Sequence, residues 1–171
     1  MQSVTLIGMP GSGKSAVGRI VASRLGWKFL DTDKNIEERH GLPLQALIDR
    51  VGEASFRRLE EEAILALEIS EPAVISTGGS VVYSEPAMRH LAAISTVVFL
   101  DACLEAILQH IALEAPRGIV GLTAGGIGEL FQERLPLYRR YAGVTVPLCP
   151  ETPEAAADKL LSGLPQDWQN D

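Results

Sequence analysis

The stretch "GMPGSGKS", residues 8–15, follows directly on the apolar run Val4–Ile7 in this chain of 171 residues. A β-branched run that ends at glycine predicts a buried strand, and the helical spacing of apolar residues over Lys14–Leu25 predicts a helix. The stretch matches the Walker A pattern GxxxxGKS/T at each defined position, between the strand and the helix that this pattern requires. It therefore predicts a loop that binds the phosphates of a nucleotide.

Each residue type in this loop supplies a part of phosphate binding. The glycines let the backbone curl so that its N–H groups point at phosphate oxygens, and the helix beginning near Lys14 adds its positive end. Lys14 reaches the β- and γ-phosphates, and Ser15 offers its hydroxyl to Mg²⁺. The expected nucleotide contacts are Gly11, Ser12, Gly13, Lys14, Ser15 and Ala16. Because the chain contains no NKxD guanine-reading motif, ATP is the expected nucleotide.

Short strands alternate with helices along the rest of the chain. Strands are predicted over residues 4–7, 28–30, 73–76, 97–100 and 144–148. Helices are predicted over 14–25, 33–40, 43–51, 53–69, 86–92, 104–113, 128–141 and 153–161. This alternation is typical of an α/β fold with a parallel sheet covered on both faces, in which ligands bind beyond the carboxyl ends of the strands.

Composition and charge exclude several function classes. The net charge of −7 disfavours general binding to nucleic acid or to anionic membranes, and no apolar stretch reaches the roughly 18 residues that span a bilayer. We expect a cytoplasmic monomer that acts on a small molecule, with one domain over residues 1–165 and a disordered tail over 166–171. Neither Cys103 nor Cys149 lies in a zinc-ligand spacing, so both are expected to be buried, reduced thiols.

Two carboxylates, Asp31 and Asp33, follow the second predicted strand. One spacer residue in an extended chain places both on the same side. Near a Mg²⁺–nucleotide, one carboxylate can hold the water shell of the metal, and the other can orient or deprotonate an attacking hydroxyl. The alternative is that the two residues cap the helix that begins here.

The helix predicted over 53–69 carries a second candidate group. Arg57 and Glu60 lie three residues apart and share a face, and Phe56 anchors that face to the core. An arginine held at a pocket rim can clamp a carboxylate with two parallel hydrogen bonds, although a surface salt bridge is the alternative. The glutamates at 61–62 are expected to face water.

Two glycine-rich segments follow. In "STGGS", residues 76–80, two glycines at a strand end let a ligand approach the backbone closely, unless they only form a tight turn. Residues 112–128 contain five glycines and a single basic residue, Arg117. This composition predicts a mobile lid that excludes water and adds positive charge, with a plain surface loop as the alternative. Beyond it, at least one arginine of 132–141 is expected to meet an anionic substrate.

Taken in order, these motifs resemble those of the shikimate kinases. The matching stretches lie between residues 4 and 142 and read "GMPGSGKSAVGRIVASRL", "FLDTDKNIEERHG", "VGEASFRRLEEEAI", "VISTGG", "VVFLD" and "ERLPLYRRYA". The resemblance implies a three-layer P-loop kinase fold with a parallel sheet in the order 2-3-1-4-5 and a mobile lid. It also implies transfer of the γ-phosphate of ATP, with Mg²⁺, to the 3-hydroxyl of shikimate. The alternatives are a kinase of another hydroxylated acid or polyol, and a non-catalytic nucleotide-dependent binding protein.

The resemblance also implies the catalytic and metal-binding residues. Lys14 would bind the nucleotide phosphates, Asp33 would hold the accepting hydroxyl and act as the base, and Arg117 would contact phosphates from the lid. Ser15 and Asp31 would lie at the Mg²⁺ ion and its waters.

For the substrate, the resemblance implies that Arg57 and Arg134 bind the shikimate carboxylate. Glu60 would support Arg57 and the ring, and Gly78 and Gly79 would bring backbone N–H groups to the substrate.

The chain departs from the family pattern at three places. Ser80 stands where the family usually has a third glycine. The lid reads Arg117-Gly118-Ile119-Val120 where the family commonly has Arg-Pro-Leu-Leu. His110 stands where the family often has an arginine that stacks on adenine. These departures leave phosphate binding intact and leave the nucleotide affinity and the identity of the acceptor open.

Overall fold

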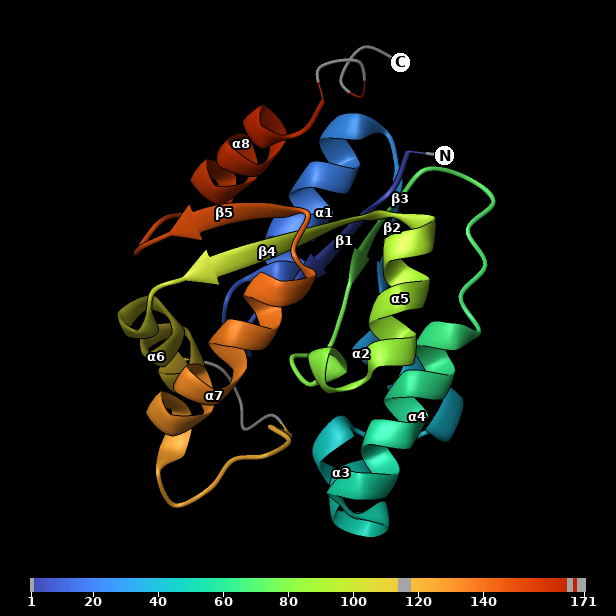
Figure 1. Ribbon diagram of the computed structural model, residues 1–171, viewed down its shortest axis with the longest axis vertical. Helices are drawn as coiled ribbons and strands as arrows, with labels where there is room; N and C mark the ends of the chain where they lie inside the picture. Colours follow the sequence, from blue (N-terminus) through green and yellow to red (C-terminus); the bar gives the residue numbers. More distant parts are fainter. Residues whose placement is uncertain (1, 114–117, 166–167, 169–171) are drawn as a thin grey trace.

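The computed structural model describes residues 2–113, 118–165 and 168, and a parallel sheet forms its centre (Figure 1). The strands are β1 (Val4–Ile7), β2 (Lys28–Asp31), β3 (Ala73–Ser76), β4 (Thr96–Ala102) and β5 (Val144–Leu148). They lie in the order β2-β3-β1-β4-β5, and each neighbouring pair is parallel. The expected order 2-3-1-4-5 is confirmed. Apart from Trp168, the tail predicted over 166–171 lies outside the described residues.

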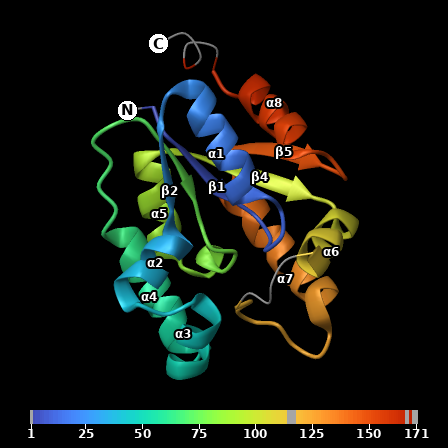
Figure 2. The same cartoon turned by 180° about the vertical axis from the view of Figure 1, so that it is seen from behind.

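Helices cover both faces of this sheet. They are α1 (Lys14–Leu25), α2 (Thr32–His40), α3 (Leu44–Val51), α4 (Glu53–Leu65), α5 (Glu85–Ile94), α6 (Leu104–Leu113), α7 (Gly126–Tyr141) and α8 (Pro153–Gly163), with a 3₁₀ turn η1 (Val81–Tyr83). Figure 1 shows α5 and α7 over one face, and Figure 2, seen from behind, shows α1 and α8 over the other. The expected three-layer α/β architecture is confirmed.

The central strands are apolar because both of their faces are covered. Every residue of β1 and β3 is buried, as is typical of the inner strands of a parallel sheet. Beyond the end of β3, the Thr77 hydroxyl donates a hydrogen bond to the carbonyl of Leu6 in β1, at 2.9 Å. This bond fixes the start of the "STGGS" segment against the strand that leads into the phosphate loop.

Besides the main core around the sheet, a separate hydrophobic cluster lies among α2, α3 and α4. It consists of Ile36, Leu47, Ile48, Phe56 and Val120. Val120 belongs to the segment between α6 and α7, and only 4% of its surface is exposed. The segment that follows residue 117 therefore packs on the helices that follow β2.

Several element boundaries differ from the sequence expectation, most of them by one or two residues. Helix α4 ends at Leu65 rather than at residue 69, because its last turn tightens and the Leu67 N–H bonds the carbonyl of Ile64. Strand β4 extends beyond residue 100 because Asp101 and Ala102 also pair with β5. The sequence pattern did not predict η1.

Both thiols are more exposed than the sequence predicts. Cys149 is exposed rather than buried, and Cys103 is half-buried, since each follows the last residue of a strand and lies beyond the covered part of the sheet.

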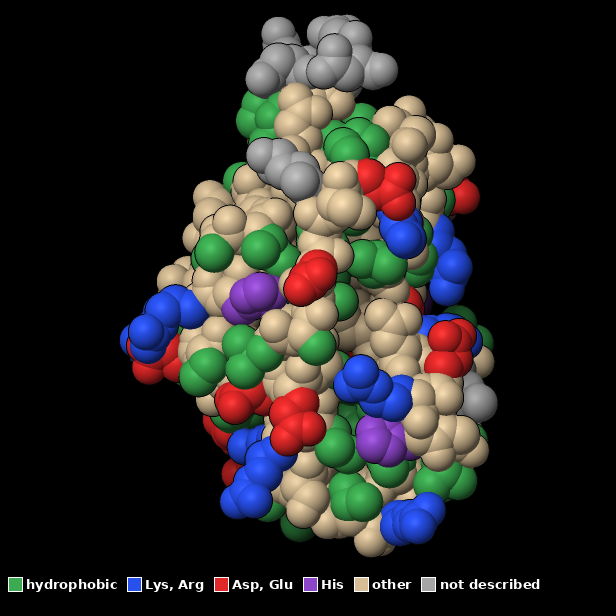
Figure 3. Space-filling view, turned by 90° about the vertical axis from the view of Figure 1, so that its right-hand side faces the viewer, with side chains coloured by type: hydrophobic (Ala, Val, Ile, Leu, Met, Phe, Trp, Pro, Cys, Tyr) green, Lys and Arg blue, Asp and Glu red, His purple; other side chains and the backbone are tan. Residues whose placement is uncertain are grey.

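On the face shown in Figure 3, acidic and basic side chains lie interspersed. Among the described residues, no helix has both the length and the apolar character that crossing a membrane requires.

Candidate active site

The phosphate loop joins β1 to α1 through a tightly curled backbone. Gly8 and Gly11 have φ angles of +151° and +78°, which side chains rarely adopt. A Cβ on Gly8 would also lie 2.9 Å from the carbonyl oxygen of Leu100. The buried Lys14 ammonium donates hydrogen bonds to the carbonyls of Gly8, at 2.9 Å, and Met9, at 2.8 Å. Its positive charge is thus held at the loop whose N–H groups suit a polyphosphate.

Helix α6 packs against this loop. A Cβ on Gly11 would lie 2.9 Å from Cγ1 of Ile111. Nδ1 of His110 lies 2.8 Å from the carbonyl oxygen of Gly11, and because that oxygen can only accept, Nδ1 carries the proton. His110 therefore has a structural contact with the phosphate loop in addition to the nucleotide contact that its position predicts.

The predicted metal ligands lie together at the carboxyl edge of the sheet. The Ser15 hydroxyl donates to Oδ2 of Asp31 at 2.9 Å, and the Ser76 hydroxyl lies 3.2 Å from that of Ser15. The other oxygen of Asp31, Oδ1, accepts from the N–H of Lys34 at 3.3 Å and caps α2. Asp31 therefore caps α2, which is one of the alternatives that the sequence left open, and it also bonds Ser15, the other predicted Mg²⁺ ligand. Hydroxyl and carboxylate oxygens are the donors that Mg²⁺ prefers.

Two carboxylates converge on the first glycine after β3. A Cβ on Gly78 would lie 2.2 Å from Oε1 of Glu60 and 2.7 Å from Oδ1 of Asp33. A side chain at this position would displace one or both carboxylates, so glycine lets both acids approach this peptide. The structure brings Asp33, Glu60 and Gly78 together as the sequence predicts.

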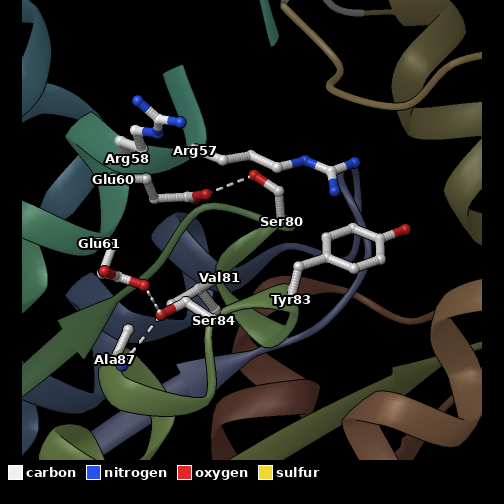
Figure 4. A pocket seen from close by; sticks show the side chains of 9 residues that line it. All are labelled: Arg57, Arg58, Glu60, Glu61, Ser80, Val81, Tyr83, Ser84 and Ala87. Atoms are coloured by element: carbon white, nitrogen blue, oxygen red, sulfur yellow. Dashed lines mark hydrogen bonds between the residues drawn. The ribbon is translucent and has the colours of Figure 1, made fainter. Parts of the chain in front are cut away.

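Glu60 is buried in this site, with 2% of its surface exposed. The Ser80 hydroxyl donates to Oε2 of Glu60 at 2.5 Å (Figure 4). Within the described part of the chain, Oε1 has no hydrogen-bond partner. Burial and the charge of Asp33 raise the pKa of Glu60 to about 7, against the opposing effects of the Ser80 hydrogen bond and of two arginines. Glu60 is therefore a buried acid with one oxygen that no described group bonds, rather than a surface residue.

Helix α7 contributes one buried arginine to the site. Arg134 is 1% exposed, and its Nη2 donates to the carbonyl of Val120 at 2.5 Å. Arg139 and Arg140 are exposed, and Arg139 lies 3.6 Å from the Asp101 carboxylate. Only one of the three arginines of 132–141 therefore points into the molecule.

Arg57 of α4 meets Arg134 on the same aromatic ring. The guanidinium carbon of Arg57 lies 4.1 Å from the ring centroid of Tyr83, and that of Arg134 lies 5.1 Å from it. A Cβ on Gly121 would lie 3.5 Å from Nη2 of Arg57 and 3.7 Å from Nη2 of Arg134. The guanidinium groups of Arg57 and Arg134, from helices distant in sequence, thus face the same space beside Gly121.

Gly79 connects the phosphate loop to these arginines. A Cβ on Gly79 would lie 2.8 Å from Cδ of Pro10 in the loop and 3.0 Å from Nη1 of Arg134. The Tyr138 hydroxyl donates to the carbonyl of Gly79 at 2.6 Å and fixes this peptide. The phosphate loop, the paired acids and the arginines therefore belong to one site.

The segment after residue 117 covers this site from the side of α3 and α4. The N–H of Gly121 donates to Oε1 of Glu53 at 3.1 Å. A Cβ on Gly118 would lie 2.6 Å from Cδ1 of Ile48 and 3.1 Å from the backbone nitrogen of Gln45. Glycine at position 118 therefore allows a close contact with α3. Arg117, the expected lid arginine, lies outside the described residues.

A pocket of about 160 Å³ opens between α4 and the η1–α5 segment (Figure 4). It is lined by Arg57, Arg58, Glu60, Glu61, Ser80, Val81, Tyr83, Ser84 and Ala87. The expectation that residue 61 faces water is wrong, because Glu61 is half-buried here and accepts a hydrogen bond from Ser84 at 2.5 Å. Neither Asp33 nor Arg134 is among the described residues that line this pocket, so it adjoins the converging site rather than containing it.

The sequence reasoning missed three residues of the site, namely Ser76, Tyr83 and Tyr138. Ser76 could have been found, because it ends β3 at the same edge as Asp31, its partner in the strand register. The two tyrosines gave no comparable signal, since a single aromatic residue in a turn or a helix is usually part of the packing.

Comparison with known proteins gives a consistent result. The family model described as shikimate kinase matches residues 10–165. The shikimate kinase of Paracidovorax citrulli is 46% identical over 144 residues, which cover 82% of this chain and 79% of that protein. The shikimate kinase of Thermobifida fusca is 37% identical over 161 residues, which cover 94% of this chain and 93% of that protein.

Solved structures agree with the sequence comparison. The shikimate kinase of Acinetobacter baumannii in complex with shikimate matches with a TM-score of 0.86 and 30% identity, over 94% of this chain and 90% of that one. The enzyme of Aquifex aeolicus matches with a TM-score of 0.80 and 31% identity, over 99% of both chains. A gluconokinase of Sinorhizobium meliloti, at 22% identity and a TM-score of 0.53, shares the fold. With the family model matching most of its length, this chain belongs to the shikimate kinase family.

Proposed function

We propose that the chain transfers the γ-phosphate of ATP to the 3-hydroxyl of shikimate and forms shikimate 3-phosphate. One observation carries the proposal: two carboxylates and the Arg134 guanidinium surround the glycines after β3, next to the phosphate loop, and Arg57 lies over the same Tyr83 ring as Arg134. An acceptor with one carboxylate and several hydroxyls complements these charges. Shikimate has this composition, and it is the ligand of the related kinase from Acinetobacter baumannii.

The carboxylate of the acceptor binds Arg57 and Arg134. These like charges face the same region beside Gly121, and among the described residues no carboxylate lies within ion-pairing distance of either. Arg57 Nε is buried without a hydrogen-bond partner in the described chain. An anionic group with two oxygens would satisfy both guanidinium groups through parallel hydrogen bonds.

The hydroxyls of the acceptor bind on the opposite side, where Asp33 and Glu60 converge. Asp33 accepts the proton of the 3-hydroxyl as that oxygen attacks, and Glu60 and the backbone N–H groups of Gly78 and Gly79 hold the ring. Direct transfer requires the reacting atoms to be held close together. The contact of Gly79 with the phosphate loop supports this arrangement.

Lys14 and the loop N–H groups bind the phosphates of ATP, and Arg117 adds positive charge from the lid. The oxygens of Ser15, Asp31 and Ser76 form a set of hard donors that suits Mg²⁺ and its waters. When bound, the metal neutralises charge on the β- and γ-phosphates. Ser15 and Asp31 would hold it.

The lid comprises about residues 112–128 of a single domain over 1–165, and it closes when the substrates bind. Burial of Val120 in the cluster of α2, α3 and α4 supports a lid on the acceptor side, because this contact joins the two. Closure excludes water from the transferring phosphoryl group. We place the protein in the cytoplasm as a monomer, without a nucleic-acid or membrane partner.

A kinase of another hydroxylated acid or polyol is the second candidate. It is favoured by Ser80, whose hydroxyl engages one oxygen of Glu60 where the family usually has glycine. ADP release, measured with a coupled assay for shikimate, quinate, gluconate and no acceptor, separates the two. We expect shikimate to give the highest kcat/KM. Turnover of another acceptor, with shikimate no faster than the ATPase background, would overturn the proposal.

A matched pair of variants tests the role of the base. Asp33→Asn should remove transfer to shikimate and leave nucleotide binding unchanged, because the amide cannot accept the proton. Asp49→Asn, which changes an exposed carboxylate on α3, should behave as the wild type. Undiminished transfer by Asp33→Asn would favour a non-catalytic role for that residue.

A further inference from the structure

Tyr83, the last residue of η1, contacts both arginines of the acceptor site. Both guanidinium carbons lie over its ring, at 4.1 Å for Arg57 and 5.1 Å for Arg134. Figure 4 shows the Arg57 side chain extending across this ring. The phenol oxygen accepts from Nε of Arg134 at 3.2 Å, while its proton is donated to Glu133 at 2.5 Å. One half-buried side chain therefore binds to both positive groups.

We propose that Tyr83 is a positioning residue for the acceptor. Its ring holds the two guanidinium groups in the orientation that grips the acceptor carboxylate, and its hydroxyl fixes the plane of Arg134. Arginine side chains are long, and ordering them when a ligand binds lowers affinity. An aromatic face that attracts both cations orders them beforehand and offsets part of their mutual repulsion. The inference rests on the proposed function, because it assumes a carboxylate-bearing acceptor.

Tyr83→Leu removes the ring while keeping an apolar side chain. Each cation–π contact at a half-exposed site favours the ordered arginine over its other conformations by roughly two- to fivefold. With two contacts, the KM for shikimate should rise about tenfold, while kcat and the KM for ATP stay within about twofold. Tyr83→Phe retains the ring and should keep the KM for shikimate within about threefold of the wild type.

A second readout distinguishes positioning from a general structural effect. The methyl ester of shikimate lacks the negative charge, so its KM should not change in Tyr83→Leu. The preference for shikimate over its ester should therefore fall about tenfold in this variant. Tyr141→Leu is the matched control, because Tyr141 also lies beneath an arginine, Arg140, at 5.3 Å, but outside the acceptor site. It should leave both KM values unchanged.

Tyr83→Gln, which also lacks the ring, carries the same expectation should the leucine variant fail to fold. If the wild type turns over shikimate normally and a folded variant without the ring has an unchanged KM for shikimate, the inference about Tyr83 is overturned. The proposed function then still stands. An equal rise in KM for shikimate and for its ester also overturns it. A wild-type protein that does not phosphorylate shikimate overturns the proposed function, and the role of Tyr83 with it.

Discussion

Replacing Glu60 by glutamine should make the stability of the chain less dependent on pH. Burial and the Asp33 carboxylate raise the pKa of Glu60 from 4.5 to about 7 in the folded chain. The folded state therefore binds this proton more tightly than the unfolded state does. The resulting stabilisation is fully present below about pH 4.5 and is lost as the pH rises through about 7.

The magnitude follows from this shift. One pKa unit corresponds to about 1.4 kcal/mol. The whole shift of the Glu60 pKa, from 4.5 to about 7, therefore corresponds to about 3 kcal/mol in the free energy of unfolding. Between about pH 5.5 and about pH 8.5, the wild type should lose about 2 kcal/mol through this group. Glu60→Gln keeps an acceptor for Ser80 but has no charge to bury, so this loss should be absent.

Urea unfolding of both proteins without ligands, at about pH 5.5 and about pH 8.5, measures the effect. The free energy of unfolding of the variant is subtracted from that of the wild type at each pH, and the two differences are compared. The contributions of groups that do not interact with Glu60 then cancel. Glu62→Gln is the control, since Glu62 is exposed on the same helix. Equal pH dependence of Glu60→Gln and wild type would refute the reasoning that this carboxylate is buried beside Asp33.

Three further substitutions test the other parts of the site. Lys14→Ala should lower kcat about 10²- to 10³-fold, because the loop loses the charge it holds for the polyphosphate, and undiminished ADP release would contradict this. Arg57→Ala should raise the KM for shikimate about 10- to 100-fold and spare that for ATP. A matching loss of ATP affinity would place Arg57 on the nucleotide instead. Gly78→Ala should abolish shikimate binding in a calorimetric titration, because its Cβ would lie 2.2 Å from a Glu60 oxygen. Wild-type affinity would show that the acids do not converge there.

Local sequence patterns predicted the elements of the fold and the phosphate loop. The continuous apolar runs located the strands, since strands covered on both faces have apolar side chains on each side. The loop was predictable because its glycines, Lys14 and Ser15 are neighbours in sequence and act on one ligand. The strand order and the residue roles came from the family resemblance. The structure confirms the order, and the roles remain predictions.

The contacts that shape the acceptor site join segments that are distant in sequence, and residue spacing does not predict them. Ser80 donates to Glu60, which lies 20 residues earlier, and Arg134 donates to Tyr83, which lies 51 residues earlier. Val120 fills a cluster formed by three helices that lie more than 50 residues earlier in the chain. A pattern within one segment specifies which face is buried, but not which other segment covers it.

The most direct test of the proposed reaction is the position of the phosphate in the product. After incubation with ATP, Mg²⁺ and shikimate, phosphorus–proton correlated NMR should show one new phosphate ester coupled to the ring proton at carbon 3, formed in equal amount with ADP. Such a product requires the phosphate loop and the two arginines to serve one cavity. Inorganic phosphate as the sole product, or an ester at a different hydroxyl, would contradict the account.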